Sequence, residues 1–357
     1  MKVFIAAGGT GGHVYPAMTV ARDFKNENLE IFWFGNQKSL EEKICEQENF
    51  NFIKLSSRGF LKKNYFEKIK ALIYLIQAFL KVLLVFIKHK PDLLFVTGGF
   101  ISLAPGLAAY FLRIPLFIQE QNSIPGLSNR ILHNFSKLTF SGFPESFKKY
   151  PDKVIFTGNP VREDIKNYKK IADKESDKGN EFKILVLGGS QGSSQLNDII
   201  LESLKQIEDI NQLIIIHQTG KKEKIGIQER YKELGVNSTV KDYITDMGFY
   251  YSQADLIISR AGAMTISEIC TLGKASILLP LPWSADNHQY HNAMFLKEME
   301  ASEVIESTIE SSEDLALLIS ELRKDSKRRL LIEKNAKNLF NTPLKTIHKL
   351  INESITK

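Results

Sequence analysis

Two stretches of this sequence share one pattern and decide the fold class: Val3-Phe-Ile-Ala-Ala-Gly-Gly-Thr-Gly-Gly12 and Ile184-Leu-Val-Leu-Gly-Gly-Ser-Gln-Gly192. Each begins with a short apolar run, typical of a buried strand, and continues through a glycine-rich turn into a helical pattern. Glycines after a strand let the backbone approach a ligand closely, and the N-terminus of the next helix favours negative charge. The pattern predicts two similar modules, each with a ligand site at its glycine loop.

Short apolar runs alternate with helical stretches around both loops, which indicates βαβ units. The expected strands are Val3–Ala7, Ile31–Phe34, Leu93–Val96, Leu116–Gln119, Leu138–Ser141, Lys183–Leu187, Leu213–His217, Leu256–Ser259 and Ser276–Leu279. Between the two series lies Arg162–Phe182, a charged stretch poor in apolar residues that we predict to be an interdomain linker. The expectation is an α/β protein with two doubly wound, Rossmann-like parallel-sheet domains facing each other across a cleft.

Composition narrows the class of protein. The chain has 357 residues, 43% hydrophobic and 25% charged, which fits two globular domains and neither a disordered nor a multi-span membrane protein. Cys45 and Cys270 are far apart, which argues against a disulfide framework or a zinc site and favours a reducing compartment. The chain starts directly with a strand pattern, so we expect no secretory signal.

The net charge of +6 is concentrated between Arg58 and Lys90, where eight Lys or Arg residues accompany a single acid, Glu67. The same region contains the apolar run Ala71–Ile87, which as a helix would span about 25 Å, short of the ~30 Å hydrocarbon core. A helix packed on the sheet is one interpretation. Basic and apolar character together also predict docking of residues 58–90 on an anionic membrane surface. Nucleic acid is not expected, because no stacking aromatics are interleaved with the lysines.

A nicotinamide or flavin dinucleotide enzyme is the obvious competitor for the glycine loops. Its G-x-G-x-x-G pattern fails here, because Val14 stands where the third glycine belongs, and no acid follows Ile31–Phe34. A tight turn without any ligand remains open for either loop alone.

Seven motifs, in order, carry a resemblance to a known family. They are Gly8-Gly-Thr-Gly-Gly-His-Val-Tyr-Pro-Ala17, Gly98-Gly-Phe-Ile-Ser102, Glu120-Gln-Asn-Ser-Ile-Pro-Gly126, Gly158-Asn-Pro-Val-Arg162, Gly188-Gly-Ser-Gln-Gly192, Ser259-Arg-Ala-Gly-Ala-Met-Thr-Ile-Ser-Glu268 and Asp286-Asn-His-Gln-Tyr-His-Asn-Ala293. Over nearly its whole length the chain resembles the MurG family of bacterial N-acetylglucosaminyltransferases, which convert lipid I into lipid II.

The resemblance implies the GT-B fold, UDP-N-acetylglucosamine as donor and lipid I, a polyprenyl-pyrophosphoryl-MurNAc-pentapeptide, as acceptor. It implies inversion at the anomeric carbon, with no cofactor and no tightly held metal. It also implies a role in peptidoglycan synthesis, cell shape and cell division, a peripheral location on the cytoplasmic face of the cell membrane, and other cell-wall synthesis proteins as partners. The domains would be 1–161 for acceptor and membrane and 162–340 for the UDP-sugar, with 341–357 packing back on the first.

His13 is the candidate catalytic base, because histidine exchanges its proton near neutral pH and this one follows a glycine loop. Positioning of acceptor or phosphate, and a purely structural role, stay open. Thr10, Gly11 and Gly12 would contact substrate, as would Asn122 at a sugar. Glu120 is a rival for proton handling.

For the donor, Ser190 in the second loop is placed for the diphosphate, and Glu268 suits two ribose hydroxyls because a carboxylate accepts both. A first-turn acid stabilised by the helix dipole is the alternative for Glu268. The resemblance puts Ile244 at the uracil, Arg162 near the nucleotide, Gln289 at the sugar hydroxyls and, less specifically, His288 at the sugar. The turn that enters the Glu268 helix adds Ala263, Met264, Thr265, Ile266 and Ser267.

Three other functions stay open: a related GT-B transferase that glycosylates a different lipid, a UDP-sugar 2-epimerase, and a non-catalytic UDP-sugar-binding protein. An epimerase acts on a soluble substrate and would gain nothing from Ala71–Ile87. Intact His13, Asn122 and Glu268 speak against a silent protein.

Overall fold

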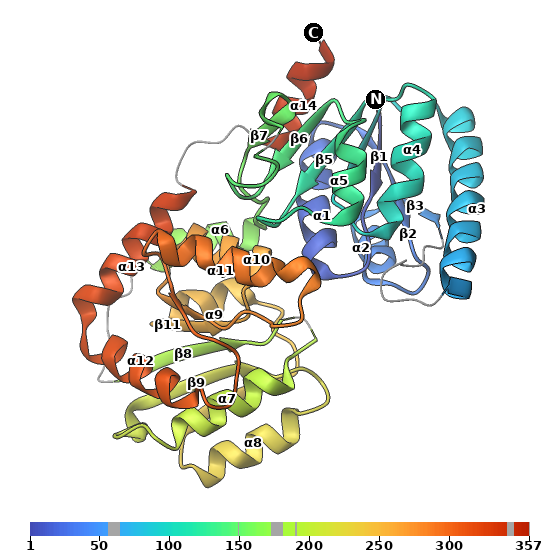
Figure 1. Ribbon diagram of the computed structural model, residues 1–357. Coiled ribbons are helices and arrows are strands. Elements are labelled where there is room, and N and C mark those ends of the chain that lie inside the picture. Colours follow the sequence, from blue (N-terminus) through green and yellow to red (C-terminus); the bar gives the residue numbers. More distant parts are fainter. Residues whose placement is uncertain (56–64, 149, 173–180, 190, 341–345, 357) are drawn as a thin grey trace. The chain divides into compact units, whose positions relative to one another are not determined.

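The chain forms two compact units in the computed structural model (Figure 1). The N-terminal unit comprises Met1–Pro160 and Leu344–Lys357, and the C-terminal unit comprises Val161–Pro343. The structure describes residues 1–55, 65–148, 150–172, 181–189, 191–340 and 346–356, without the side chains of 65–68, 151, 169–172 and 356. The cleft between the two domains stays a prediction.

Within the described part of the N-terminal unit, seven parallel strands form one sheet in the order β3-β2-β1-β4-β5-β6-β7. Their bounds are β1 Lys2–Ala6, β2 Glu30–Gly35, β3 Asn51–Lys54, β4 Leu93–Val96, β5 Leu116–Glu120, β6 Leu138–Ser141 and β7 Val154–Phe156. The helices are α1 Gly11–Asn26, α2 Leu40–Glu48, α3 Tyr65–His89, α4 Leu103–Phe111, α5 Leu127–His133 and α14 Ile347–Thr356, with short 3-10 turns at Phe100–Ser102 and Pro151–Lys153.

Helices cover both faces of this sheet. Successive strand residues point to opposite faces, so neighbouring residues enter different cores. Val3 and Ile5 of β1 join the core formed with α1 and α14, whereas Phe4 and Ala6 join the core formed with α3 and α4. Strands buried on both faces read as continuous apolar runs, which is why the sequence pattern revealed them.

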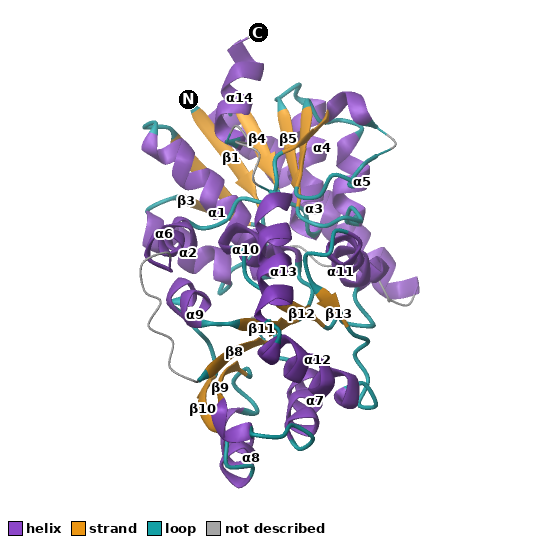
Figure 2. Ribbon diagram, turned by 90° about the vertical axis from the view of Figure 1, so that its left-hand side faces the viewer, coloured by secondary structure: helices purple, strands orange, loops and turns teal. Residues whose placement is uncertain are grey.

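The C-terminal unit repeats this plan with six described parallel strands in the order β10-β9-β8-β11-β12-β13 (Figure 2). Their bounds are β8 Phe182–Leu187, β9 Leu213–Gln218, β10 Asn237–Lys241, β11 Leu256–Ser259, β12 Ser276–Leu278 and β13 Glu303–Val304. The helices are α6 Glu163–Ala172, α7 Ser194–Leu204, α8 Lys224–Glu233, α9 Met247–Gln253, α10 Ala263–Leu272, α11 His288–Glu298, α12 Ser312–Lys324 and α13 Ser326–Leu339, with 3-10 turns at Ile210–Gln212 and Ala285–Asn287.

The predicted linker Arg162–Phe182 is wrong in two places. Glu163–Ala172 forms helix α6, which packs on α9 and α10, and Phe182 begins strand β8. The stretch looked like a linker because α6 is mostly polar, but Ile165 is fully buried and Tyr168 packs against the backbone of Gly248. The change of unit lies between Pro160 and Val161.

The strand order fixes where ligands can bind. In each sheet the order reverses once, between β1 and β4 and between β8 and β11, and the paired strands run parallel. The loops that leave the carboxyl ends of such neighbours diverge to opposite faces and open a crevice. Each glycine loop predicted from the sequence lies at one of these two reversal points.

Candidate functional site

Two hydrogen-bond acceptors fix the tautomer of the neutral His13 ring. Its Nδ1 lies 2.8 Å from the carbonyl oxygen of Thr97 and 2.8 Å from Oε1 of Gln121. The Gln121 oxygen faces the ring because its amide nitrogen donates to the carbonyl of Gln119 at 3.1 Å. In the neutral ring Nδ1 therefore carries the proton, and Nε2 keeps its lone pair. The half-buried His13 is thus prepared to accept a proton at Nε2.

The loop after β4 fits closely around this histidine. Gly98 has φ +99°, and a Cβ there would lie 3.2 Å from Cε1 of His13. A side chain at Gly98 would push the ring away from its two acceptors, so glycine is required both by backbone conformation and by space. Thr97 adds a second tie, since its hydroxyl donates to the carbonyl of His13 at 2.9 Å.

Glu120 is buried, and both oxygens of its carboxylate accept hydrogen bonds from the segment that follows it. One carboxylate oxygen accepts from the amide and side chain of Asn122, at 2.9 and 3.2 Å. The other accepts from the amide of Gly126 at 3.0 Å and from Asn129 at 2.8 Å. The geometry favours a role in holding the loop that carries Asn122 over the proton handling considered from the sequence.

An acidic side chain lies beneath the first glycine loop. Glu41 is buried, and one of its oxygens accepts from the amide of Asn36 at 3.0 Å. Its Oε2 has no hydrogen-bond partner among the described residues. A Cβ on Gly8 would come within 2.7 Å of the other oxygen. An acid so close makes this loop better suited to a hydroxyl-bearing ligand than to a diphosphate.

Close backbone packing and a buried glutamine hold the second glycine loop, after β8, in its conformation. Gly192 has φ +78°, and a Cβ there would overlap the carbonyl of Thr219. Gln218, the last residue of β9, donates to the carbonyl of Gly189 and accepts from the amide of Ile244, both at 2.8 Å. The amide of Ile244, a residue whose backbone the resemblance puts at the uracil, is therefore already engaged. Ser190 lies outside the described residues.

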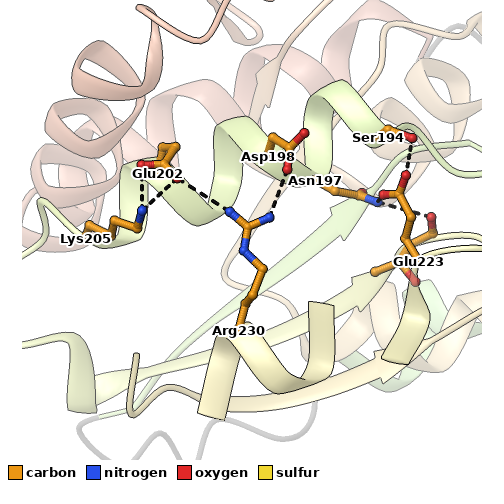
Figure 3. A network of polar contacts seen from close by, with 8 residues as sticks. Ser194, Asn197, Asp198, Glu202, Lys205, Glu223 and Arg230 are labelled. Carbon is orange, nitrogen blue, oxygen red and sulfur yellow. Dashed lines mark hydrogen bonds and ion pairs between the residues drawn. The ribbon is translucent and has the colours of Figure 1, made fainter. Parts of the chain in front are cut away.

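The helix that follows this loop is fixed to its neighbour by polar contacts (Figure 3). Ser194 and Asn197 in the first turns of α7 both donate to Glu223, the residue that precedes α8. Farther along, Arg230 of α8 contacts Asp198 at 2.9 Å and Glu202 at 3.5 Å. These contacts hold the start of α7, and with it the end of the loop, against α8.

Glu268 lies in the second turn of α10, so the first-turn interpretation is wrong. The hydroxyl of Tyr251 donates to its Oε2 at 2.9 Å. Burial raises the pKa of Glu268 to about 7, and the positive charge of Arg162 opposes that rise. Arg162 itself has its Nε 3.7 Å from Asp164. A carboxylate held by a phenol and close to a cation can accept two hydroxyl groups from a ligand.

The remaining predicted donor residues surround the start of α10 and the loop after β12. Ala263, Ile266 and Ser267 are buried, while Met264 and Thr265 are half-buried. Gln289 accepts from the amide of Leu281 at 3.0 Å, and His288 Nδ1 lies 2.6 Å from the carbonyl of Ala285. Asp286 and Asn287, just before them, both have positive φ. Two successive left-handed residues are uncommon, and such conformations cluster at functional loops.

Comparison with known proteins gives one consistent result. The glycosyltransferase family 28 N-terminal domain matches residues 3–141 and its C-terminal domain matches residues 183–351. The UDP-N-acetylglucosamine--N-acetylmuramyl-(pentapeptide) pyrophosphoryl-undecaprenol N-acetylglucosamine transferase of Coxiella burnetii (strain RSA 493 / Nine Mile phase I) is 36% identical over 338 residues, 95% of this chain and 94% of that protein. The protein of the same name from Vesicomyosocius okutanii is 38% identical over 338 residues, with 93% and 94% covered.

The chain belongs to the MurG family. The crystal structure of Acinetobacter baumannii MurG superposes with a TM-score of 0.79 at 28% identity, covering 100% of this chain and 99% of that one. The two-sheet GT-B architecture is thereby confirmed. A UDP-GlcNAc 2-epimerase from Neisseria meningitidis shares the fold, with a TM-score of 0.67 at 15% identity, and shows the fold alone.

Seen as a MurG family member, the chain divides its predicted residues between two sites. The N-terminal unit holds exposed Thr10 and Gly12 and half-buried Gly11, His13 and Asn122 at the β1–β4 reversal. The C-terminal unit holds Arg162, Ile244, Gln289 and the residues 263–268. Sequence reasoning missed Gln121 and Gln218, although both stand at the carboxyl ends of strands, where ligands of such sheets bind. It also missed Glu41 and Tyr251, for which no local pattern gave a signal.

Proposed function

We propose that this chain transfers N-acetylglucosamine from UDP-N-acetylglucosamine to the C4 hydroxyl of MurNAc in lipid I, with inversion, and so forms lipid II for peptidoglycan synthesis. The observation that carries the proposal is the His13 ring, whose Nδ1 faces two acceptors and whose Nε2 keeps its lone pair. The names of relatives 36–38% identical over most of the chain support the same donor and acceptor.

The reaction is a single displacement at the anomeric carbon. Nε2 of His13 takes the proton of the acceptor hydroxyl while its oxygen forms the new bond to that carbon. The bond from the carbon to the diphosphate oxygen breaks at the same time, and its electron pair leaves with UDP. The imidazolium that forms is stabilised by Thr97 and Gln121, which both accept from the protonated Nδ1.

The C-terminal unit is the proposed donor site. Glu268 would accept the two ribose hydroxyls, Ile244 would meet the uracil, and loop Gly188–Gly192 with the start of α7 would carry the diphosphate. Among the described residues, no group of three or more His, Cys, Asp or Glu side chains could hold a metal ion. We propose that protein donors stabilise the leaving diphosphate, as the resemblance implies.

Helix α3 supports action at a membrane surface. The most apolar 18 residues of its Ile69–His89 segment have a mean hydropathy of 2.1, and only 22% of them are buried. The segment is long and apolar enough to cross a bilayer. The 17-residue length inferred from the sequence was therefore too short. One face, with Ala78, Val82 and Phe86, is buried in the core of the N-terminal unit. A helix held in this way would lie on the cytoplasmic leaflet with its other face, which fits a lipid-linked acceptor.

A transfer assay tests the function. Purified full-length protein is incubated with radiolabelled UDP-N-acetylglucosamine and, in separate reactions, with a short-chain lipid I analogue or with diacylglycerol, and label is followed into the lipid product. Transfer that depends on the analogue is the expected result. Label appearing only as free epimerised sugar would assign an epimerase, transfer only to diacylglycerol a different glycolipid transferase, and UDP binding without turnover a non-catalytic protein.

A further inference from the structure

Arg260 lies at the reversal point of the C-terminal sheet, directly after β11. Its backbone amide donates to the carbonyl of Leu187, the last residue of β8, at 3.2 Å. Only 5% of the residue is exposed. Its guanidinium reaches to Ser193, which follows Gly192 and precedes α7: Nε and Nη2 lie 3.1 and 2.8 Å from the serine oxygen. A buried cation therefore supports the end of the second glycine loop.

Every described contact of this guanidinium is to a neutral oxygen. Besides Ser193, the acceptors are Oε1 of Gln195 at 3.1 Å, the carbonyl of Leu279 at 3.1 Å and the hydroxyl of Ser307 at 2.5 Å. No described carboxylate lies within ion-pair distance of Arg260, and the carboxylate of Glu223, which accepts from Ser194 and Asn197, makes no described contact with it. Burial lowers the pKa of Arg260 to about 10, so the side chain remains charged at neutral pH.

A buried charge without a counter-ion is costly. Neutral hydrogen bonds reduce the cost but do not cancel the positive potential, which is stronger in a buried site than in water. That potential is directed at Ser193 and the start of α7, where the proposed function puts the diphosphate.

Ser193 transmits this charge toward the loop surface. Its oxygen accepts from Arg260 and from the amide of Leu196 at 3.4 Å. A hydroxyl has two acceptor positions and one donor, so the serine proton is left to point elsewhere. A hydroxyl that accepts from a cation is a stronger donor, because hydrogen bonds in a chain polarise one another.

We propose that Arg260 is the buried counter-charge for the phosphates of a nucleoside diphosphate at the end of the second glycine loop, Gly192–Ser193, acting as a positioning residue through Ser193. The inference rests on the proposed function, which puts the donor nucleotide in this unit. It adds a residue whose effect is specific to the phosphates and leaves the nucleoside contacts unchanged.

Calorimetric affinities for uridine and UDP test the proposal on the full chain. Arg260→Gln removes the charge and keeps an amide donor, and should lower the UDP affinity about tenfold or more while the uridine affinity stays within about threefold. Arg260→Lys keeps the charge and should retain most of the preference for UDP. Arg328→Gln removes an arginine of the same unit that is already paired with two acids, Glu303 and Glu321, and should leave the preference unchanged.

Equal losses for uridine and UDP in Arg260→Gln would reduce Arg260 to a packing role and overturn the proposal. So would unchanged affinities, or a loss in Arg260→Lys as large as in Arg260→Gln. If Arg260→Gln does not fold, as judged by circular dichroism, Arg260→Lys alone decides: retention of the preference supports the proposal and its loss refutes it. Wild-type protein that binds UDP no better than uridine would instead contradict the donor site itself.

Discussion

His13 shows how two neighbours can settle a side chain's chemistry. A lone histidine after a glycine loop is compatible with a base, with a phosphate contact or with a structural role. Acceptors at 2.8 Å from Nδ1 select the tautomer in which Nε2 is the basic atom. A phosphate contact would need a donor at Nε2, so in the neutral ring the geometry favours the base.

His13→Ala should therefore lower turnover by about 10²–10⁴-fold, the usual contribution of a general base. The affinity for UDP should stay within about threefold, because the proposed nucleotide residues lie in the C-terminal unit. Turnover is measured with the transfer assay and UDP affinity by calorimetry. Near-normal turnover would remove His13 from the role of base, and a matching loss of UDP affinity would assign it to donor binding.

Glu268 should make nucleoside binding depend on pH. With its pKa at about 7, the carboxyl that accepts both ribose hydroxyls is mostly neutral at pH 6 and mostly ionised at pH 8, so uridine affinity should rise about tenfold across that interval. Uridine is used because it lacks phosphates that titrate in the same range. Glu268→Gln should flatten the profile, while Glu313→Gln, a change of an exposed acid on α12, should not.

The same group has a defined effect on stability. Its folded pKa lies above the ordinary value of 4.5, so the folded protein keeps a proton that the unfolded chain releases. The free energy of unfolding should then decrease as the pH rises from about 4.5 to about 7. In thermal melts, the melting temperature of Glu268→Gln should rise relative to that of the wild type as the pH increases from about 4.5 to about 7. A constant difference would show that burial does not raise the pKa of Glu268.

The candidate site was predictable from sequence where a residue type and a motif coincide, as at His13, Asn122 and Glu268. It was not predictable where a side chain acts through the fold. Gln121 and Gln218 matter because neighbouring strands bring them to His13 and Ile244. Tyr251 reaches Glu268 from a different helix, a contact that no spacing along the chain indicates.

Among the elements, α3 is the one whose exposed surface least resembles that of a soluble helix. An apolar stripe recurs every three or four residues along it: Ile69, Leu72, Ile73, Ile76, Leu80, Leu84 and Ile87, each at least 41% exposed. Phe111 of the adjacent α4 extends the stripe at 70% exposed. Lys70, Lys81 and Lys88 are exposed on the same helix. Arg58, Lys62 and Lys63 of the predicted basic patch, and the side chain of Lys68, lie outside the described residues.

Leu84→Glu should weaken binding to anionic liposomes about tenfold or more, since burying a leucine in an apolar phase is worth about 1.5–3 kcal/mol. Leu84 is 70% exposed, so the change should not disturb folding. Leu330→Glu introduces the same charge at a site 61% exposed on α13 and serves as the control. Sedimentation with phosphatidylglycerol vesicles measures both. Equal effects at the two sites would refute docking through α3.

The predicted strands were all found, and the strands that sequence reasoning missed are the sheet edges. β3, β7, β10 and β13 each pair on one side only and carry half-buried or exposed residues. Their hydrophobic signal is weak because an edge strand needs less burial. Central strands, covered on both faces, reveal themselves as apolar runs.

On the scale of the whole molecule, the chain leaves the N-terminal unit at Pro160 and rejoins it at Leu344. Helix α14 then packs on α1, with Ile347 and Ile351 buried in the core below it. His348 lies 3.3 Å from Asp23 and 3.2 Å from Glu27, both on α1. Residues more than 300 positions apart thus complete one core.

Removal of residues 346–357 should destabilise the N-terminal unit by about 3–6 kcal/mol, from the two isoleucines alone. The melting transition that UDP shifts should stay in place, because it reports the C-terminal unit. Scanning calorimetry with and without UDP separates the two. Lys349→Ala, an exposed change on α14, is the control and should alter neither transition. A truncation that moves the UDP-dependent transition instead would show that α14 supports the other unit.

This return of the chain also sets an order of events on the ribosome. Everything from Val161 to Pro343 is synthesised before α14 can reach α1, so the C-terminal sheet can close while the N-terminal core is still unsealed. The aliphatic surface of α1 then stays accessible to chaperones, proteases and other nascent chains throughout that interval. A chain that ends before α14 would have a folded C-terminal unit and an N-terminal unit with part of its core exposed. Such a chain should be readily recognised by chaperones and proteases.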